Sequence, residues 1–300
     1  MSIQASKWPV NHFLYRGVFP PGGEDGTPNG NTPVTTCAIM NRMALDDIDL
    51  GFLRGCLVEA GHIALARRGL VTASIKADHT PVTEVDHQVE AFLIARIESR
   101  YPGHQVLSEE SGLHPSPGQV TWVIDPIDGT RSFASGLPIW GVSIGILSGG
   151  EPLAGGLYLP VTGEMYWGTR QQAFYNDHPL PPAPQVDLDS PLTFLAVPSN
   201  FYLHFDVTFP RARSLGSTAA HLAYAATGAA AGVLLRGISL WDMAGLLPVL
   251  SAVGIMITDL SGRAFRPGDF LDGRVIREPL LAAHPAVSEA LRGTIRPKIA

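Results

Sequence analysis

The chain has 300 residues, of which 45% are hydrophobic and 16% are charged, and its formal net charge is −6. This is the composition of a globular protein that can bury one large core or two smaller ones. The negative charge and the absence of any long Lys/Arg run exclude a nucleic-acid surface. The longest uncharged run, 219–235, is rich in Ala and Gly and carries His221, and we read it as a buried helix rather than a membrane span. The two cysteines, Cys37 and Cys56, lack zinc-ligand spacing. We therefore expect a cytoplasmic protein whose partners are small molecules.

Two composition changes divide the chain. Residues 1–42 contain many Gly, Pro and Asn and few side chains to bury, which predicts a mobile extension. Prolines cluster again at 179–184 and mark a second boundary. The expected organisation is the extension, an N-terminal α+β domain over 43–182 and a C-terminal α/β domain over 183–300.

The first periodic segments predict two helices. Residues 46–68 carry apolar side chains at helical spacing, with acids at the front and arginines at the back. A second helix is predicted over 84–100, with Thr83 as its N-cap and Asp86 as the acidic partner of a capping box. A cap is one role for Asp86, and facing a metal site through water is a second role that is compatible with it.

Carboxylates follow two predicted strands. Residues 105–107 form a short strand, and Glu109 and Glu110 come directly after it. Successive side chains at a strand end point to opposite sides, so only one of the two acids can face a shared site. We select Glu109 as the ligand and place Glu110 behind it.

The segment TWVIDPIDGT organises the rest of the chain. It predicts a buried strand followed by a tight turn that holds Asp125 and Asp128, with Gly129 and Thr130 opening a short helix. Alone, the two acids would be ordinary turn and cap residues. Beside a helix start, however, acidic oxygens suit a divalent cation that bridges to a phosphate.

The remaining chain supplies sheets and two further helix starts. Alternating and apolar runs over 131–180 predict antiparallel strands of the larger sheet. Beyond them, TFLAVP and GVLLRG read as strands, and Ser214, Gly216, Ser217 and Thr218 start a helix. This Gly/Ser/Thr start suits a phosphate or serves as a plain cap. Asp242 opens a last predicted helix over 241–254.

Four segments now stand in order: PVTEVD, SEESG, WVIDPIDGT and WDMAG, followed by DLSG. Together they resemble the inositol monophosphatase family of metal-dependent, lithium-sensitive phosphomonoesterases, over residues 46–284. The resemblance implies a layered αβαβα sugar-phosphatase fold, α+β / α/β in class, with a larger N-terminal and a smaller C-terminal domain around the site. We also expect a homodimer.

The resemblance implies roles for individual residues. The ligands of two or three Mg²⁺ ions, with Mn²⁺ as an alternative, would be Glu109, Asp125, the Ile127 carbonyl, Asp128 and Asp242, with Asp86 acting through water. The attacking water would be oriented by Thr130 with Asp86 or Glu109. Gly129 and Thr130 would present amides to the phosphate. Beyond the resemblance, we expect Arg131, Ser217 and Arg236 to contact the substrate as well. Lys76 matches a basic residue that such enzymes place before PVTEVD.

The substrate is less defined than the reaction. Inositol-preferring members place an acid seven residues before the WD aspartate, and Leu235 stands there in this chain. An inositol-1-phosphate-type substrate is the first expectation. Histidinol phosphate, suggested by the segment 129–147, and 3′-phosphoadenosine 5′-phosphate are alternatives. A non-catalytic phospho-ligand-binding module is the competing class, but it should lack a metal carboxylate or the threonine, and this chain retains them all.

Overall fold

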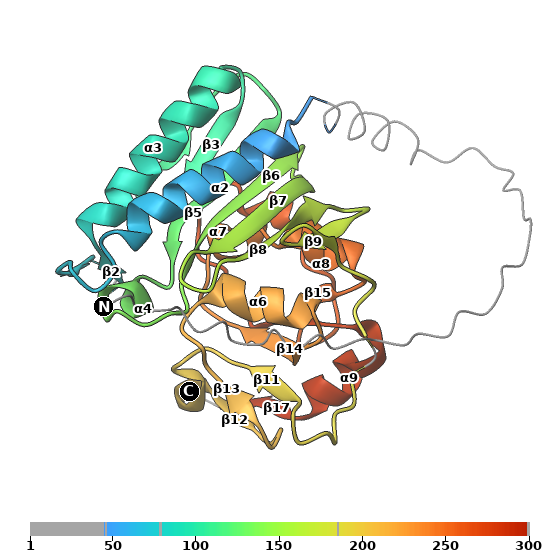
Figure 1. Ribbon diagram of the computed structural model, residues 1–300. Coiled ribbons are helices and arrows are strands. Elements are labelled where there is room, and N and C mark those ends of the chain that lie inside the picture. The colour runs from blue at the N-terminus through green and yellow to red at the C-terminus, as the bar shows by residue number, and fades with distance from the viewer. Residues whose placement is uncertain (1–44, 46, 78–79, 185, 299–300) are drawn as a thin grey trace, which may run out of the picture.

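The computed structural model describes residues 45, 47–77, 80–184 and 186–298, so the predicted extension and Cys37 lie outside the described residues. Helices and sheets alternate in layers: two helices, an eight-stranded sheet, further helices, a five-stranded sheet and a last helix (Figure 1). The predicted αβαβα arrangement is confirmed. No helix of the described part of the chain is both long and apolar enough to cross a membrane.

The outer helical layer consists of α2 (Leu50–Leu65) and α3 (Glu84–Arg100). The helix predicted over 46–68 is shorter, because the Asp49 carboxylate accepts from the Phe52 amide at 3.1 Å and caps the helix there. The second helix has the predicted bounds, with Thr83 as N-cap and the capping box formed. The hairpin β1 (Ser74–Ile75) and β2 (Pro81–Val82) lies between the two helices in the chain.

The eight-stranded sheet is antiparallel except for the parallel pair of β3 and β5 and therefore confirms the predicted pattern. Side chains of β5 alternate between two cores, with Trp122 and Ile124 packed toward α2 and α3 and Val123 toward the middle helices. The strands, in spatial order, are β10 (His178–Pro179), β9 (Ala173–Tyr175), β8 (Glu164–Thr169), β7 (Glu151–Leu159), β6 (Gly141–Ser148), β5 (Val120–Asp128), β3 (Gln105–Ser108) and β4 (Gly112–His114).

The middle layer contains α6 (Thr218–Ala226), α7 (Trp241–Ala244) and α8 (Leu247–Ala252). The single helix predicted over 241–254 is therefore wrong, since the chain breaks it into α7 and α8. Pro248 lies in the first turn of α8, where its missing N–H and fixed φ are tolerated, but it would break a continuous helix.

The five-stranded sheet mixes parallel and antiparallel pairs, and α9 (Pro285–Gly293) covers its outer face (Figure 1). TFLAVP and GVLLRG both form strands as predicted. Its strands, in spatial order, are β13 (Ala212–Arg213), β11 (Phe194–Ala196), β14 (Ala230–Leu235), β16 (Leu280–Ala283) and β15 (Met256–Asp259). The smaller elements are α5 (Phe201–His204), the 3₁₀ turn η1 (Pro267–Phe270) and the pair β12 (Phe205–Val207) and β17 (Ile295–Pro297).

Candidate active site

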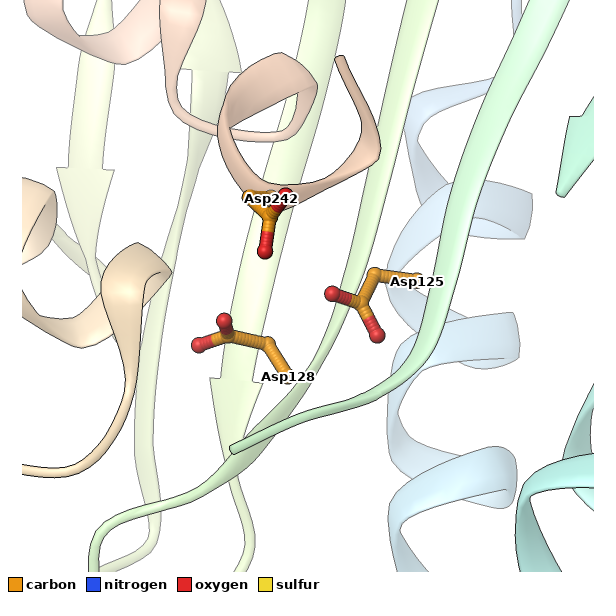
Figure 2. A group of neighbouring side chains, drawn as sticks. All are labelled: Asp125, Asp128 and Asp242. Carbon is orange, nitrogen blue, oxygen red and sulfur yellow. The ribbon is translucent and has the colours of Figure 1, made fainter. Parts of the chain in front are cut away.

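Three carboxylates meet between β5 and α7. Asp125, Asp128 and Asp242 each offer an oxygen, and these oxygens lie within 4.8 Å of one another. Figure 2 shows the three side chains pointing into a common space, two from β5 and one from α7. The two sequence motifs that carry these acids, far apart in the chain, are thus brought together.

A bulge in β5 brings two of these acids to the same side. Asp125 pairs with Ser143 and Asp128 pairs with Gly141, so two residues of β5 stand opposite one of β6. In a regular strand, residues three apart point to opposite faces, and the extra residue of a bulge corrects this. The predicted tight turn is therefore wrong, because β5 runs on to Asp128. The bulge, rather than a turn, holds the two acids on the same side.

The third acid depends on close packing of α7 against the sheet. A Cβ atom added to Gly245 would lie 2.5 Å from the Gly156 carbonyl oxygen and 2.5 Å from Ser143 Oγ. Only glycine permits this approach. The Asp242 carboxylate also accepts from the Ser239 amide at 2.6 Å, which fixes its direction at the helix start.

The start of α6 holds Asp128. Its carboxylate accepts from the Ser217 hydroxyl, from the Thr218 amide at 3.1 Å and from the Ala219 amide at 3.0 Å. Burial raises the pKa of Asp128 to about 6, although these hydrogen bonds act in the opposite direction. Ser217 is the N-cap of α6, since its Oγ accepts from Ala220 N at 3.0 Å, so the helix begins later than Ser214, where the sequence placed its start. The helix start expected to face a phosphate is bound to Asp128 in this structure.

The three acids fit a divalent cation. Asp125 Oδ1 is buried and has no hydrogen-bond partner among the described residues. Burial raises the pKa of Asp125 and Asp242 well above the usual range, and the charges of neighbouring carboxylates raise it further. A donor set made only of oxygen is the one that Mg²⁺ and Mn²⁺ prefer. A cation between these acids would relieve both the repulsion and the missing contact.

Thr130 connects the bulge to Asp86. It begins α4 (Thr130–Ala134), and its Oγ1 lies 3.1 Å from the Ile127 carbonyl oxygen and 3.3 Å from Asp86 Oδ1. The other Asp86 oxygen accepts from Thr83 N at 2.8 Å and Thr83 Oγ1 at 2.6 Å. Burial raises the pKa of Asp86. The capping role of Asp86 is confirmed. The same carboxylate also lies within hydrogen-bond distance of Thr130.

Gly129 gives α4 its left-handed N-cap, with φ at 93°. A Cβ atom here would lie 2.7 Å from the Gly216 carbonyl oxygen, so the segment before α6 approaches the backbone directly. The starts of α4 and α6 therefore lie next to each other.

A lysine bridges the acids after β3. Lys76 Nζ lies 2.9 Å from Glu109 Oε1 and 2.7 Å from Glu110 Oε2. Burial raises the pKa of both carboxyls, that of Glu110 to about 7, although the lysine lowers it. Burial would lower the pKa of Lys76, but its hydrogen bonds to these acids raise it above its usual range. Glu109 lines the same cavity as the three aspartates, and its charge raises the pKa of Asp125 further.

Glu90 is a site residue that the sequence analysis missed. It is buried in α3, and its Oε1 accepts from the amides of Glu110 and Ser111 at 3.2 and 3.0 Å. The Ser111 hydroxyl donates to the same oxygen at 3.0 Å. Its spacing of four residues from Asp86 places both acids on one helix face, and this spacing was an available signal. Glu90 therefore orders the turn that presents Glu109.

A cavity of about 370 Å³ extends from the carboxylates to the end of β14. His221 and Leu235 line it, and both are buried. The predicted substrate-contacting residues also line it: Gly129, Thr130, Arg131, Ser217 and Arg236.

Most of the chain is similar to known proteins. The model of the inositol monophosphatase family matches residues 56–296. The inositol-1-monophosphatase ImpA of Mycolicibacterium smegmatis is 30% identical over 233 residues, covering 72% of this chain and 82% of ImpA. The histidinol-phosphatase of Chlorobaculum parvum is 32% identical over 251 residues, covering 79% and 92% of the two chains.

Solved structures agree with the family match. Thermotoga maritima IMPase superimposes with a TM-score of 0.72 at 24% identity, covering 82% of this chain and 95% of that one. The Staphylococcus aureus enzyme SaIMPase-II, solved with inositol monophosphate bound, gives 0.65 at 26% identity, covering 81% and 92%. The layered fold, the acidic cluster and these matches lead to one conclusion. The chain belongs to the inositol monophosphatase family and is a phosphoric monoester hydrolase.

Proposed function

We propose that this protein hydrolyses a small phosphomonoester with Mg²⁺, using an activated water as the nucleophile. The observation that carries the proposal is the cluster of Asp125, Asp128 and Asp242, whose oxygens lie within 4.8 Å of one another. The unpartnered Oδ1 of Asp125 adds to it. Two or three ions would be held by Glu109, the three aspartates and the Ile127 carbonyl, with Asp86 acting through water.

Bound Mg²⁺ supplies a lowered pKa for water and charge stabilisation at the phosphate oxygens. The protein supplies the position and the proton path. Thr130 Oγ1 lies 3.3 Å from Asp86, so its hydroxyl can donate to that carboxylate while accepting from the attacking water. Asp86, with its raised pKa, is suited to take up a proton. Glu109 is the second candidate for this role.

The chain also orients the phosphate. Gly129 and Thr130 would direct amides toward it from the start of α4, and Arg131 would add positive charge. Ser217 and Arg236 line the same cavity and would contact the rest of the substrate. The Ser217 hydroxyl already donates to Asp128. Its main role is therefore to position that carboxylate, and its contact with the substrate is secondary.

The proposed substrate is of the inositol-1-phosphate type. Histidinol phosphate and 3′-phosphoadenosine 5′-phosphate are the alternatives, and a histidinol-phosphatase stands among the relatives. We further propose Mn²⁺ as a substitute ion, inhibition by lithium, a cytoplasmic homodimer, and a domain division at 43–182 and 183–300. The chain retains the carboxylates and the threonine of the four motifs, which opposes the alternative of a non-catalytic phospho-ligand-binding module.

The test is phosphate release from inositol 1-phosphate, histidinol phosphate and nucleotide monoesters, with Mg²⁺ and with excess chelator. We expect release with the metal and none with the chelator, and restoration when Mg²⁺ is added back. Equal rates in chelator would show that the carboxylates do not hold the catalytic ion. Binding of the esters without release would instead support the binding module.

A further inference from the structure

We propose that the active site prefers phosphomonoesters that carry a second anionic group, which Arg236 receives at the end of the cavity away from the carboxylates. This inference rests on the proposed function and names the substrate class for the same site. The inferred contact with Arg236 distinguishes substrates by the group attached to the phosphate. The phosphate itself, where the reaction occurs, is the same in all of them.

Arg236 is the first residue after β14 and lines the cavity half-buried. Among the described residues it forms no hydrogen bond or ion pair. Such an arginine, partly removed from water, binds a carboxylate or phosphate group strongly, because its planar guanidinium can make two parallel hydrogen bonds.

The acids that line the cavity gather at its other end. They are Glu109, Asp125, Asp128 and Asp242. The remaining lining near the end of β14 is uncharged: Leu234, Leu235 and Ile238 are apolar, and Ser199, Asn200 and Ser214 are neutral polar residues. Among the described residues, no carboxylate other than those four lines the cavity, so a substrate ammonium near Arg236 finds no further acid to pair with it.

His221 adds a donor to the same cavity. Its Nε2 accepts from the Leu215 amide at 2.8 Å, so the hydrogen of a neutral imidazole lies on Nδ1. Burial lowers the pKa of His221 to about 4, which keeps the ring neutral near pH 7. No described residue accepts from Nδ1. The free Nδ1 donor of His221 and the charge of Arg236 therefore both favour a substrate group that accepts hydrogen bonds and carries negative charge.

The substrate class follows from these charges. A bisphosphate, or a monoester with a carboxylate, places one phosphate at the carboxylate end and its second anion near Arg236. A monoester whose leaving group carries an ammonium places that positive charge next to the Arg236 guanidinium. No acid in the described part of the chain stands between the two charges, so this substrate is disfavoured. A neutral polyol phosphate lies between the two cases.

The experiment compares matched substrates on the full-length protein with Mg²⁺. The pairs are inositol 1-phosphate with inositol 1,4-bisphosphate, and adenosine 3′-monophosphate with adenosine 3′,5′-bisphosphate; histidinol phosphate represents the amines. We expect kcat/KM to be about 10- to 100-fold higher for the doubly anionic member of each pair, mainly through KM, and lowest for the amine.

Three variants locate the effect. Arg236→Gln should reduce the ratio within each pair to about threefold or less, and Arg236→Lys should retain part of it, since the charge stays but the fork is lost. Arg296→Gln makes the same change at an exposed arginine outside the cavity and should keep the full ratio. A Tm close to that of the wild type verifies folding in each case.

Each outcome decides the inference. Equal kcat/KM within the wild-type pairs would overturn it while leaving the proposed function intact. A preference that persists in Arg236→Gln would overturn the assignment to this residue. If no monoester is hydrolysed with Mg²⁺, the proposed function is wrong and this inference with it.

Discussion

At the carboxylate end of the cavity, Asp128 accepts hydrogen bonds from Ser217, Thr218 and Ala219, and Asp86 accepts from Thr83 and Thr130. At the other end, no hydrogen bond of the described structure holds Arg236. The first end is built from backbone geometry, a bulge and helix starts. The second depends mainly on which side chains follow β14. Changes at the first end should alter the rate for every substrate, whereas changes at the second should alter the order among substrates.

The largest expected effect is that of Asp128→Asn. The amide has nearly the same shape but cannot supply an anionic ligand, so kcat should fall by about 10³-fold or more for all substrates. Steady-state rates with Mg²⁺, together with a circular dichroism spectrum, measure this. Asp272→Asn, at an exposed acid outside the cavity, is the control. A near-normal rate in Asp128→Asn would make the metal assignment wrong.

Thr130→Ala comes next, with an expected loss in kcat of about 10²-fold. The change removes the hydroxyl that lies 3.3 Å from Asp86 and leaves the carboxylates in place. Thr130→Ser keeps the hydroxyl and should recover most of the rate. If the serine variant were as slow as the alanine variant, the methyl group rather than the hydroxyl would matter.

Gly245→Ala tests the packing that positions Asp242. The added methyl meets Gly156 and Ser143 at 2.5 Å, so α7 must move away from the sheet. We expect a loss of stability of about 1 to 3 kcal/mol and a loss in kcat/KM of the order of tenfold. Gly103→Ala, where a Cβ atom meets nothing within 4 Å, should change neither quantity. An unaltered kcat/KM in a destabilised Gly245→Ala variant would show that the approach of α7 does not control the site.

The smallest expected effect is on the thermal stability of the metal-free protein. The pKa of Asp128 is raised to about 6, so between about pH 4 and pH 6 the folded state binds more protons than the unfolded chain. The free energy of unfolding should therefore fall as pH rises through this window, and the raised pKa values of Asp125 and Asp242 extend the fall upward.

Melting temperatures in chelator at pH 5 and pH 7 measure this fall, and Mg²⁺ at pH 7 should restore what was lost. Asp125→Asn should flatten the dependence, because it removes one of the repelling charges. A melting temperature that rises with pH in chelator would contradict the mutual repulsion of the acids.

The layers and most strands followed from periodicity, since Trp122, Val123 and Ile124 alternate between two cores as a strand should. Other features depend on contacts that no local pattern contains. The bulge arises from the pairing of β5 with β6, and the predicted turn was wrong for that reason. The break between α7 and α8 does have a sequence signal, because Pro248 is compatible with the first turn of a helix but not with its interior.

The candidate acids were identified from motifs, and the structure brings Asp125, Asp128 and Asp242 together. Two relations were beyond the sequence. The bond between Asp128 and the start of α6 joins segments 89 residues apart. The spacing of Glu90 from Asp86 indicates a shared helix face, but the backbone amides that Glu90 accepts from, in the turn after β3, cannot be identified from that spacing. The roles of the individual site residues stay predictions.

Leu235 and Arg236, neighbours at the end of β14, differ in how strongly a mutation would affect the stability of the protein. Leu235 belongs to the buried core between the two sheets and also forms the cavity wall, so an exchange at this position changes packing and recognition at once. Arg236 is half-buried and unpaired, and an exchange there leaves the core intact. New substrate preferences can therefore arise through position 236 by single steps that natural selection tolerates, while position 235 needs a compensating change in the core first.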